Sequence, residues 1–115
     1  PGIKGLSENI RVRSVVGRFL EQSRVFWFAN DGSPEVYIGS ADLMHRNMDL
    51  RVEVLTPIRD EQIVRYLKDV FLENYLKDQI NARLLRSDGT YKRVAARTSG
   101  GFDSQMAFVG KEIEV

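Results

Sequence analysis

The sequence predicts an α/β domain in which helices cover a mixed β-sheet. Apolar residues recur at spacings of three and four in two separate stretches, which is typical of amphipathic helices. Between and after them lie short runs rich in β-branched and aromatic residues, bounded by turn-forming residues, which indicate strands. With 115 residues, 43% of them hydrophobic, the chain can bury one core. We therefore treat residues 1–115 as a single domain.

The first expected element is a helix over residues 12–20. Its apolar face would consist of Val12, Val15, Val16, Phe19 and Leu20. Either Ser7 or Asn9 could cap its start. Its polar face would carry Arg11, Ser14 and Arg18.

A β-hairpin is expected next. Residues 25–28 and 36–38 are β-rich runs, and residues 30–34, with the sequence NDGSP, are a strong turn signal between them. Because nearly all the strand residues are apolar, we expect both faces of these strands to be covered.

A third strand is predicted over residues 51–55, after an irregular polar segment at residues 42–50. Thr56-Pro57 would end this strand. Alternation along a strand places Arg51 and Glu53 on the same face and the intervening valines on the other. A shared face would let the arginine bind phosphate beside the carboxylate, although a surface ion pair is the plainer interpretation.

A second helix is expected to begin after Asp60, which would cap it. Its apolar stripe would consist of Ile63, Leu67, Val70, Phe71 and Asn74. The pattern weakens after residue 78. There we expect a turn at Asp88-Gly89, a flexible loop at residues 99–101, and a short helix capped by Asp103 that reaches about Glu112.

The charge composition says little about partners, since the formal net charge is +1. Twelve of the 17 basic residues are arginine, whose planar fork suits phosphate. The chain has no cysteine, which excludes a disulfide framework and fits a cytoplasmic protein. No apolar run is long enough for a membrane span, and the sequence contains no signal-peptide pattern. A start without methionine leads us to expect a piece of a longer protein.

Other candidate chemistry in the sequence is weak. His45 is the only histidine, and a lone histidine in a loop is more often an ordinary surface residue than a functional one. No spacing of histidine and acidic residues predicts a metal site. The aromatic run at residues 26–28 is interpreted as sheet core rather than a platform for bases, so no nucleic-acid partner is predicted.

Two short motifs carry the strongest functional signal, Gln22-Ser23-Arg24 and Gly39-Ser40. If the first is extended, the Gln22 and Arg24 side chains point the same way, and a strand ending in Gly39-Ser40 can bring a small-residue turn beside them. A fixed cation, hydroxyl and amide donors, and closely approaching backbone can hold a phosphoryl group. Glutamine can donate a hydrogen bond there, but it cannot be a nucleophile or a general acid.

The motifs, in order, resemble the C-terminal domain of the long, multidomain bacterial polyphosphate kinases. The resemblance is strongest over residues 1–95 and rests on residues 5–14, 17–21, 37–42, 46–47, 51–54 and 85–93. It implies a half-domain of the phospholipase D-like superfold, which pairs two His-x-Lys elements. Gln22 stands at the position of the second family histidine. The first, which is phosphorylated in the family, would lie before residue 1.

The resemblance implies reversible transfer of the terminal phosphate of ATP to polyphosphate, with Mg²⁺. The catalytic positions would be Gln22, Arg51 and Glu53, the last ordering an arginine or helping to hold the metal. The phosphate-binding positions would be Arg24, Ser40, Asp42, Arg46 and Asn47. Leu43 and Leu50 depart from the family, where tryptophan and arginine are usual.

The implied partners are ATP, polyphosphate and the upstream domains of the same protein. The resemblance leaves a homo-oligomer and membrane association of the longer protein open. We expect the isolated chain to be inactive. Two other functions stay open: a non-catalytic phosphate- or polyphosphate-binding module of a divergent paralogue, and a phospholipase D-like nuclease relative.

Overall fold

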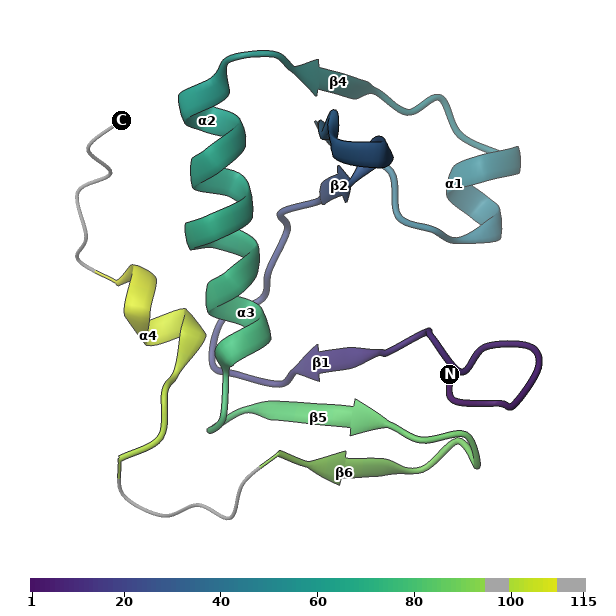
Figure 1. Cartoon of the computed structure of the whole chain (residues 1–115), viewed down its shortest axis with the longest axis vertical. Coiled ribbons are helices and arrows are strands. Elements are labelled where there is room, and N and C mark those ends of the chain that lie inside the picture. The colour runs from purple at the N-terminus through teal and green to yellow at the C-terminus, as the bar shows by residue number, and fades with distance from the viewer. Residues whose placement is uncertain (95–99, 110–115) are drawn as a thin grey trace. The chain divides into compact units, whose positions relative to one another are not determined.

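The computed structural model describes residues 1–94 and 100–109, and it confirms a fold that combines helices and strands (Figure 1). These residues form two compact units, one from residues 1–20 with residues 73 onward, the other from residues 21–72. Each unit has its own three-stranded antiparallel sheet, where the sequence predicted one mixed sheet. Within the described ranges, no helix has the length and apolar content needed to cross a bilayer.

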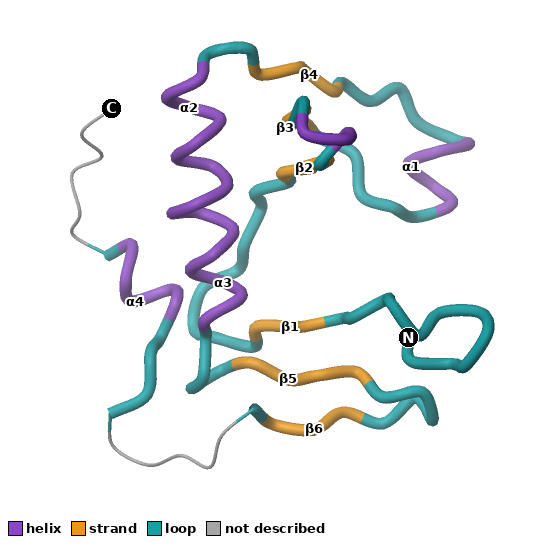
Figure 2. The backbone as a smooth tube through the Cα atoms, viewed as in Figure 1, coloured by secondary structure: helices purple, strands orange, loops and turns teal. Residues whose placement is uncertain are grey.

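The sheet of the first unit has the strand order β1-β5-β6 (Figure 2). Its strands are β1 (Arg13–Val15), β5 (Ala82–Leu85) and β6 (Tyr91–Arg93). The helix predicted over residues 12–20 is therefore wrong. The valines of this segment are β-branched and favour a strand, and Val15 pairs with the buried Ala82. Ser7 caps no helix, because its hydroxyl accepts from the Ile3 amide in a turn.

Residues 17–19 follow β1 and lie against the side chain of Gln105. The side-chain amide of Gln105 pairs with the Phe19 backbone, accepting at 2.9 Å and donating at 2.7 Å. A Cβ on Gly17 would overlap this amide. Glycine at this position therefore leaves room for the Gln105 side chain.

Two helices of the first unit, α3 (Glu73–Lys77) and α4 (Ser104–Phe108), are linked by a stacked pair of Tyr75 and Phe108 rings. Asp103 caps α4 as predicted, accepting from the Met106 amide. Glu112, the predicted end of this helix, and Ser99 of the predicted loop lie outside the described residues. The turn at Asp88-Gly89 is confirmed, but the flanking strands β5 and β6 were not predicted.

The second unit contains the predicted hairpin. Strands β2 (Val25–Phe28) and β3 (Glu35–Gly39) pair across a 3₁₀ turn at Asn30–Gly32, and β4 (Leu55–Ile58) pairs with the other side of β3. The third strand thus begins where its prediction ended. It includes Pro57, which is tolerated because β4 is an edge strand of this sheet.

Helix α1 (His45–Asp49) forms where the sequence predicted irregular structure. The second predicted helix is confirmed: α2 (Glu61–Arg65) continues into a π-helical segment, Tyr66–Leu72. Asp60 caps it, accepting from the amides of Gln62 and Ile63 at 2.9 and 3.1 Å.

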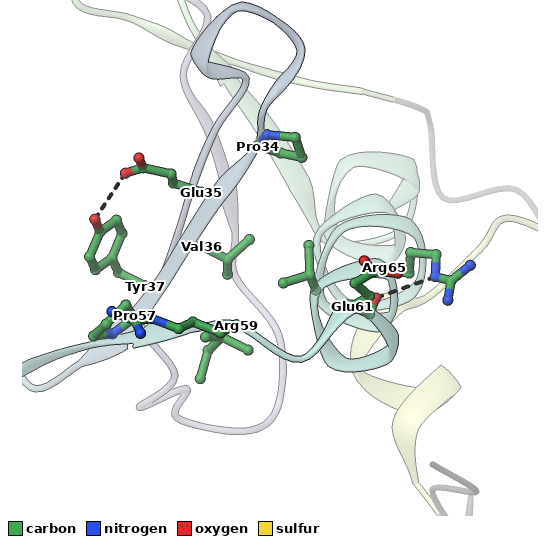
Figure 3. A pocket seen from close by; sticks show the side chains of 10 residues that line it. Pro34, Glu35, Val36, Tyr37, Pro57, Arg59, Glu61 and Arg65 are labelled. Atoms are coloured by element: carbon green, nitrogen blue, oxygen red, sulfur yellow. Dashed lines mark hydrogen bonds between the residues drawn. The ribbon is translucent and has the colours of Figure 1, made fainter.

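The helix covers only one face of the second sheet. Figure 3 shows Val36 pointing toward α2, while Tyr37 lies on the opposite side of β3. Val36 is 1% exposed, whereas Phe28, which meets Tyr37 edge-on, is 53% exposed. Within the described residues, the prediction that both strand faces are covered is therefore wrong.

Candidate functional site

The candidate site lies where β3 ends in the second unit. There the backbone of Ser40 pairs with the segment before β4, since its amide donates to the Val54 carbonyl at 3.0 Å. A Cβ on Gly39 would overlap that same carbonyl, so glycine allows the close approach of the two chains. The Ser40 hydroxyl in turn accepts from the Val54 amide at 3.2 Å. This double contact fixes the turn on which the other groups of the site converge.

Arg24, just before β2, is held by a bidentate ion pair with Asp42. The Arg24 Nε and Nη2 atoms donate to the two carboxylate oxygens at 2.8 and 3.2 Å. This hydrogen-bonded pairing raises the pKa of Arg24 and holds the pKa of Asp42 below its usual value. The third contact of the guanidinium is to the backbone carbonyl of Gln22, at 2.8 Å. Each of the three guanidinium nitrogens of Arg24 therefore donates to a group of this chain.

Glu53 is the second carboxylate of the site, and both of its oxygens accept hydrogen bonds. The Ser40 hydroxyl donates to Oε2, and Asn47 Nδ2 donates to Oε1 at 2.7 Å. These two bonds, then the charges of Arg51 and Arg24, hold the pKa of Glu53 below its usual value. Glu53 is thus an ionised group that links the β3 turn to helix α1.

Asn47 is only 4% exposed. Its amide nitrogen binds Glu53, and its Oδ1 atom has no hydrogen-bond partner within the described chain. A phosphate contact by Asn47 stays a prediction, and the contact that the structure places there is the one with Glu53.

Arg46 and Arg51 differ from Arg24 in their partners. Both are exposed, and neither forms a salt bridge with a residue in the described ranges. Their charges nevertheless help to lower the pKa of Asp42, so both lie within electrostatic reach of the site. His45 points elsewhere: its side chain is 80% exposed and lies 3.3 Å from Asp49, as expected of a surface residue.

A cavity of about 470 Å³ opens beside these groups. The predicted motif residues Gln22, Arg24 and Ser40 line one part of it. The remaining wall is largely apolar and was not predicted, although Leu67 and Phe71 belong to the apolar stripe that the sequence shows. Its apolar side chains are Val25, Ile38, Val54, Leu67 and Phe71, and Ser23, Gly39 and Thr56 complete the wall.

A larger groove, of about 650 Å³, lies at the other end of β3 and β4, next to α2 (Figure 3). It contains none of the predicted site residues.

The described residues supply no ligand set for magnesium by themselves. The oxygens of Asp42 and of Glu53 accept hydrogen bonds from Arg24, Ser40 and Asn47, and no group of three acidic or histidine residues gathers in the described part of the chain. No step is therefore assigned to a metal held by these residues.

The site thus combines exposed arginines with a glycine–serine turn, and guanidinium and hydroxyl groups are donors that can contact phosphate oxygens. Residues 1–105 match the family model described as "Polyphosphate kinase C-terminal domain 2", and the chain belongs to this family.

Among its relatives is a polyphosphate kinase of Xylella fastidiosa (strain Temecula1), 50% identical over 98 residues, which are 85% of this chain and 14% of the relative. A polyphosphate kinase of Prochlorococcus marinus is 57% identical over 91 residues, 79% of this chain and 13% of the relative. The crystal structure of polyphosphate kinase from Porphyromonas gingivalis superposes with a TM-score of 0.78 and 36% identity, covering 87% of this chain and 15% of that one. The chain thus spans about one seventh of the length of these relatives.

Proposed function

We propose that this chain is the phosphate-positioning part of a longer enzyme that transfers the terminal phosphate of ATP reversibly to polyphosphate. Membership of the family and the names of the relatives support this activity. The phosphorylated histidine would come from an upstream domain of the same protein. The absence of cysteine supports a location in the cytoplasm, where ATP is available.

The observation that carries the proposal is the division of the arginines into two kinds. Arg24 is neutralised by Asp42, whereas Arg46 and Arg51 are charged, exposed and without a salt bridge among the described residues. Phosphoryl transfer depends on positioning and on neutralising the phosphate oxygens. Arg46 and Arg51 are therefore the cations we assign to the substrate, and Arg24 with Asp42 is the support that orders the turn.

Glu53 acts in this proposal as a positioning residue. Held on both oxygens by Ser40 and Asn47, it keeps a fixed negative charge near Arg51. Gln22 stands on the wall of the cavity and offers an amide that can donate to a phosphate oxygen but carries no titrating proton. These roles combine one amide donor, one ordering carboxylate, and two arginines that form no salt bridge within the described residues, all near the Ser40 turn.

The test is calorimetric titration of the chain with tripolyphosphate. Arg51→Ala should weaken binding by about tenfold, which corresponds to ~1.4 kcal/mol. The matched control is Arg65→Ala, which removes the same charge from α2, where Arg65 Nε donates to the Glu61 carbonyl within the helix. The control should bind like the unmodified chain. Equal losses in the two variants would remove the case for a site at Arg51.

A second candidate function is a non-catalytic module that binds polyphosphate. Gln22 favours it, because its side chain can neither be phosphorylated at nitrogen nor move a proton near neutral pH. The two candidates differ in the parent protein, where the kinase requires a histidine in a preceding domain. An assay of ATP-dependent polyphosphate synthesis by the full-length protein separates them.

A further inference from the structure

Two arginines face each other across the sheet of the first unit. In the β5–β6 register, Arg83 stands directly opposite Arg93. The Cβ atoms of such a pair are about 4.5–5.5 Å apart, and like charges directly opposite destabilise a sheet. The arrangement therefore costs stability unless something of opposite charge lies between them.

No carboxylate fills that role in the described ranges. Neither Arg83 nor Arg93 forms a salt bridge with any acidic side chain in residues 1–94 or 100–109. On its other side Arg83 faces Ser14 of β1, which is uncharged. Asp103 approaches only as far as Asn81: its Oδ2 atom accepts from that side chain at 3.1 Å, and its Oδ1 atom accepts from the Met106 amide.

The pair opens onto a small cavity of about 70 Å³. Its walls are Arg83, Arg93, Asn81, Val16, Ile80 and Ala82. Pockets for drug-sized molecules measure roughly 300–1,000 Å³, so this cavity suits a single small ion rather than a nucleoside. Two guanidinium groups beside a space of this size match a tetrahedral oxyanion, whose oxygens can each accept from a planar fork.

We propose that Arg83 and Arg93 form a second phosphate-binding site, which takes either inorganic phosphate or one phosphate group of a polyphosphate chain. None of its residues belongs to the site at Ser40, so it stands whether or not the proposed function does. The bound oxyanion supplies the negative charge that the cross-strand pair does not receive from the described residues. In the free protein the two arginines repel each other, and binding relieves that repulsion.

The test compares Arg93→Gln with Lys92→Gln. Arg93 is exposed on β6, so its replacement should leave the fold intact. Lys92 is the neighbouring residue of the same strand, but it pairs with Leu84 and therefore lies on the other face of the sheet. The two variants remove the same charge from adjacent positions. Arg83→Gln removes the other arginine of the pair, and it is compared with Lys92→Gln in the same way.

Titrations with inorganic phosphate and with tripolyphosphate are followed by amide NMR shifts of β5 and β6 and by thermal unfolding. The unmodified chain and Lys92→Gln should respond alike, and Arg93→Gln should lose at least about tenfold in affinity. Without ligand, Arg93→Gln should unfold at a higher temperature than the unmodified chain, because the repulsion is gone. A response to tripolyphosphate alone would assign the site to the polymer, and a response to both would assign it to the phosphate group itself.

Three results would overturn the proposal. Equal losses in Arg93→Gln and Lys92→Gln would mean that a diffuse positive field attracts the anion. Shifts with an oligonucleotide but with neither phosphate probe would make the surface a nucleic-acid contact instead. Loss of the β5 and β6 shifts in Arg51→Ala would show that the response comes from the other site, whereas unchanged shifts in that variant support two separate sites.

Discussion

The two units of this chain use the same charged residue types in opposite ways. In the first unit the central carboxylate, Asp78, is fully buried, while Arg83 and Arg93 have no acidic partner in the described residues. In the second unit the carboxylates lie near the surface, and one of them, Asp42, is fully engaged by an arginine. Whether a charged side chain supports the fold or is available to a ligand therefore depends on its partner and its exposure rather than on its residue type.

The largest effect we expect in this comparison is from Asp78→Ala. Its carboxylate accepts four hydrogen bonds, from the amides of Asn81, Ala82 and Ser104 and from the Ser104 hydroxyl, all at 2.7–2.8 Å. Alanine would leave these buried donors unpaired, at about 1–3 kcal/mol for each donor that water cannot reach. We expect the free energy of unfolding in urea to fall by roughly 3 kcal/mol or more.

The control for this prediction is Asp69→Ala, which removes an exposed carboxylate from the second unit and should change stability by less than about 0.5 kcal/mol. Burial raises the pKa of Asp78, but the hydrogen bonds from Ser104, Asn81 and Ala82 lower it further, so its net shift is downward. A lowered pKa stabilises the fold above about pH 4 and loses that contribution as the pH falls through the folded-state value. Equal loss of stability in both variants would show that the hydrogen bonds of Asp78 do not stabilise the first unit.

The next largest effect concerns Gln22→His in the second unit. An imidazole there would sit on the cavity wall beside Arg24, where it could donate a hydrogen bond and also carry a proton. In the full-length parent protein we expect faster polyphosphate synthesis, by up to about 10²-fold if acid–base help alone is missing. An unchanged or lower rate would mean that Gln22 is not a degraded catalytic position.

The same substitution can be tested in this chain through tripolyphosphate binding. The affinity should become pH-dependent between about pH 5.5 and 7.5 and should be tighter on the acid side, where the imidazole is charged. The unmodified chain has no titrating group at that position, so its profile records the protonation of tripolyphosphate itself and serves as the reference. A profile of Gln22→His that matches this reference would place the introduced ring away from the phosphate.

Sequence patterns predicted some parts of this fold because local signals agreed with tertiary packing. The hairpin followed from β-rich runs around a glycine- and proline-containing turn, and the helix after Asp60 followed from its cap. The segment after residue 12 failed because valines at helical spacing also suit a strand, and pairing with residues 82–84 decided the outcome. Strands β5 and β6 are short and lack clear alternation, so no local signal marked them.

The candidate site could be predicted only in part. The family resemblance implied that Arg24, Ser40, Asp42, Asn47 and Glu53 belong to one site, and hydrogen bonds join Arg24 to Asp42 and Glu53 to Ser40 and Asn47. Their roles in phosphate binding stay predictions. What the sequence could not give is which arginine is neutralised. That depends on a bidentate contact between residues 18 positions apart and on the exposure of helix α1. The opposition of Arg83 and Arg93 likewise depends on register, which only the paired strands define.

The smallest effect we expect is from Asp42→Asn, which sharpens the contrast between paired and unpaired arginines. The side chains of Arg24 and Asp42 are 28% and 35% exposed, so their ion pair is partly solvated and its loss should change stability little. The substitution also frees Arg24 and removes a negative charge near Arg46 and Arg51. We therefore expect tripolyphosphate to bind a few-fold more tightly.

The control is Asp49→Asn, which removes an equal charge from the end of α1, where Asp49 meets only His45 among the described residues. It should leave the affinity nearly unchanged.

Because Arg24 holds the pKa of Asp42 below its usual value, Asp42 stays ionised at neutral and mildly acidic pH. Its contribution to stability is present above the unfolded-state pKa, about 3.9, and disappears only as the pH falls through the lowered folded-state value. The difference in affinity between Asp42→Asn and the unmodified chain should accordingly persist down to about pH 4 and shrink below it. Weaker binding by Asp42→Asn at neutral pH would mean that the ion pair is needed to shape the site, and Arg24 would then be a support that cannot act as a free cation.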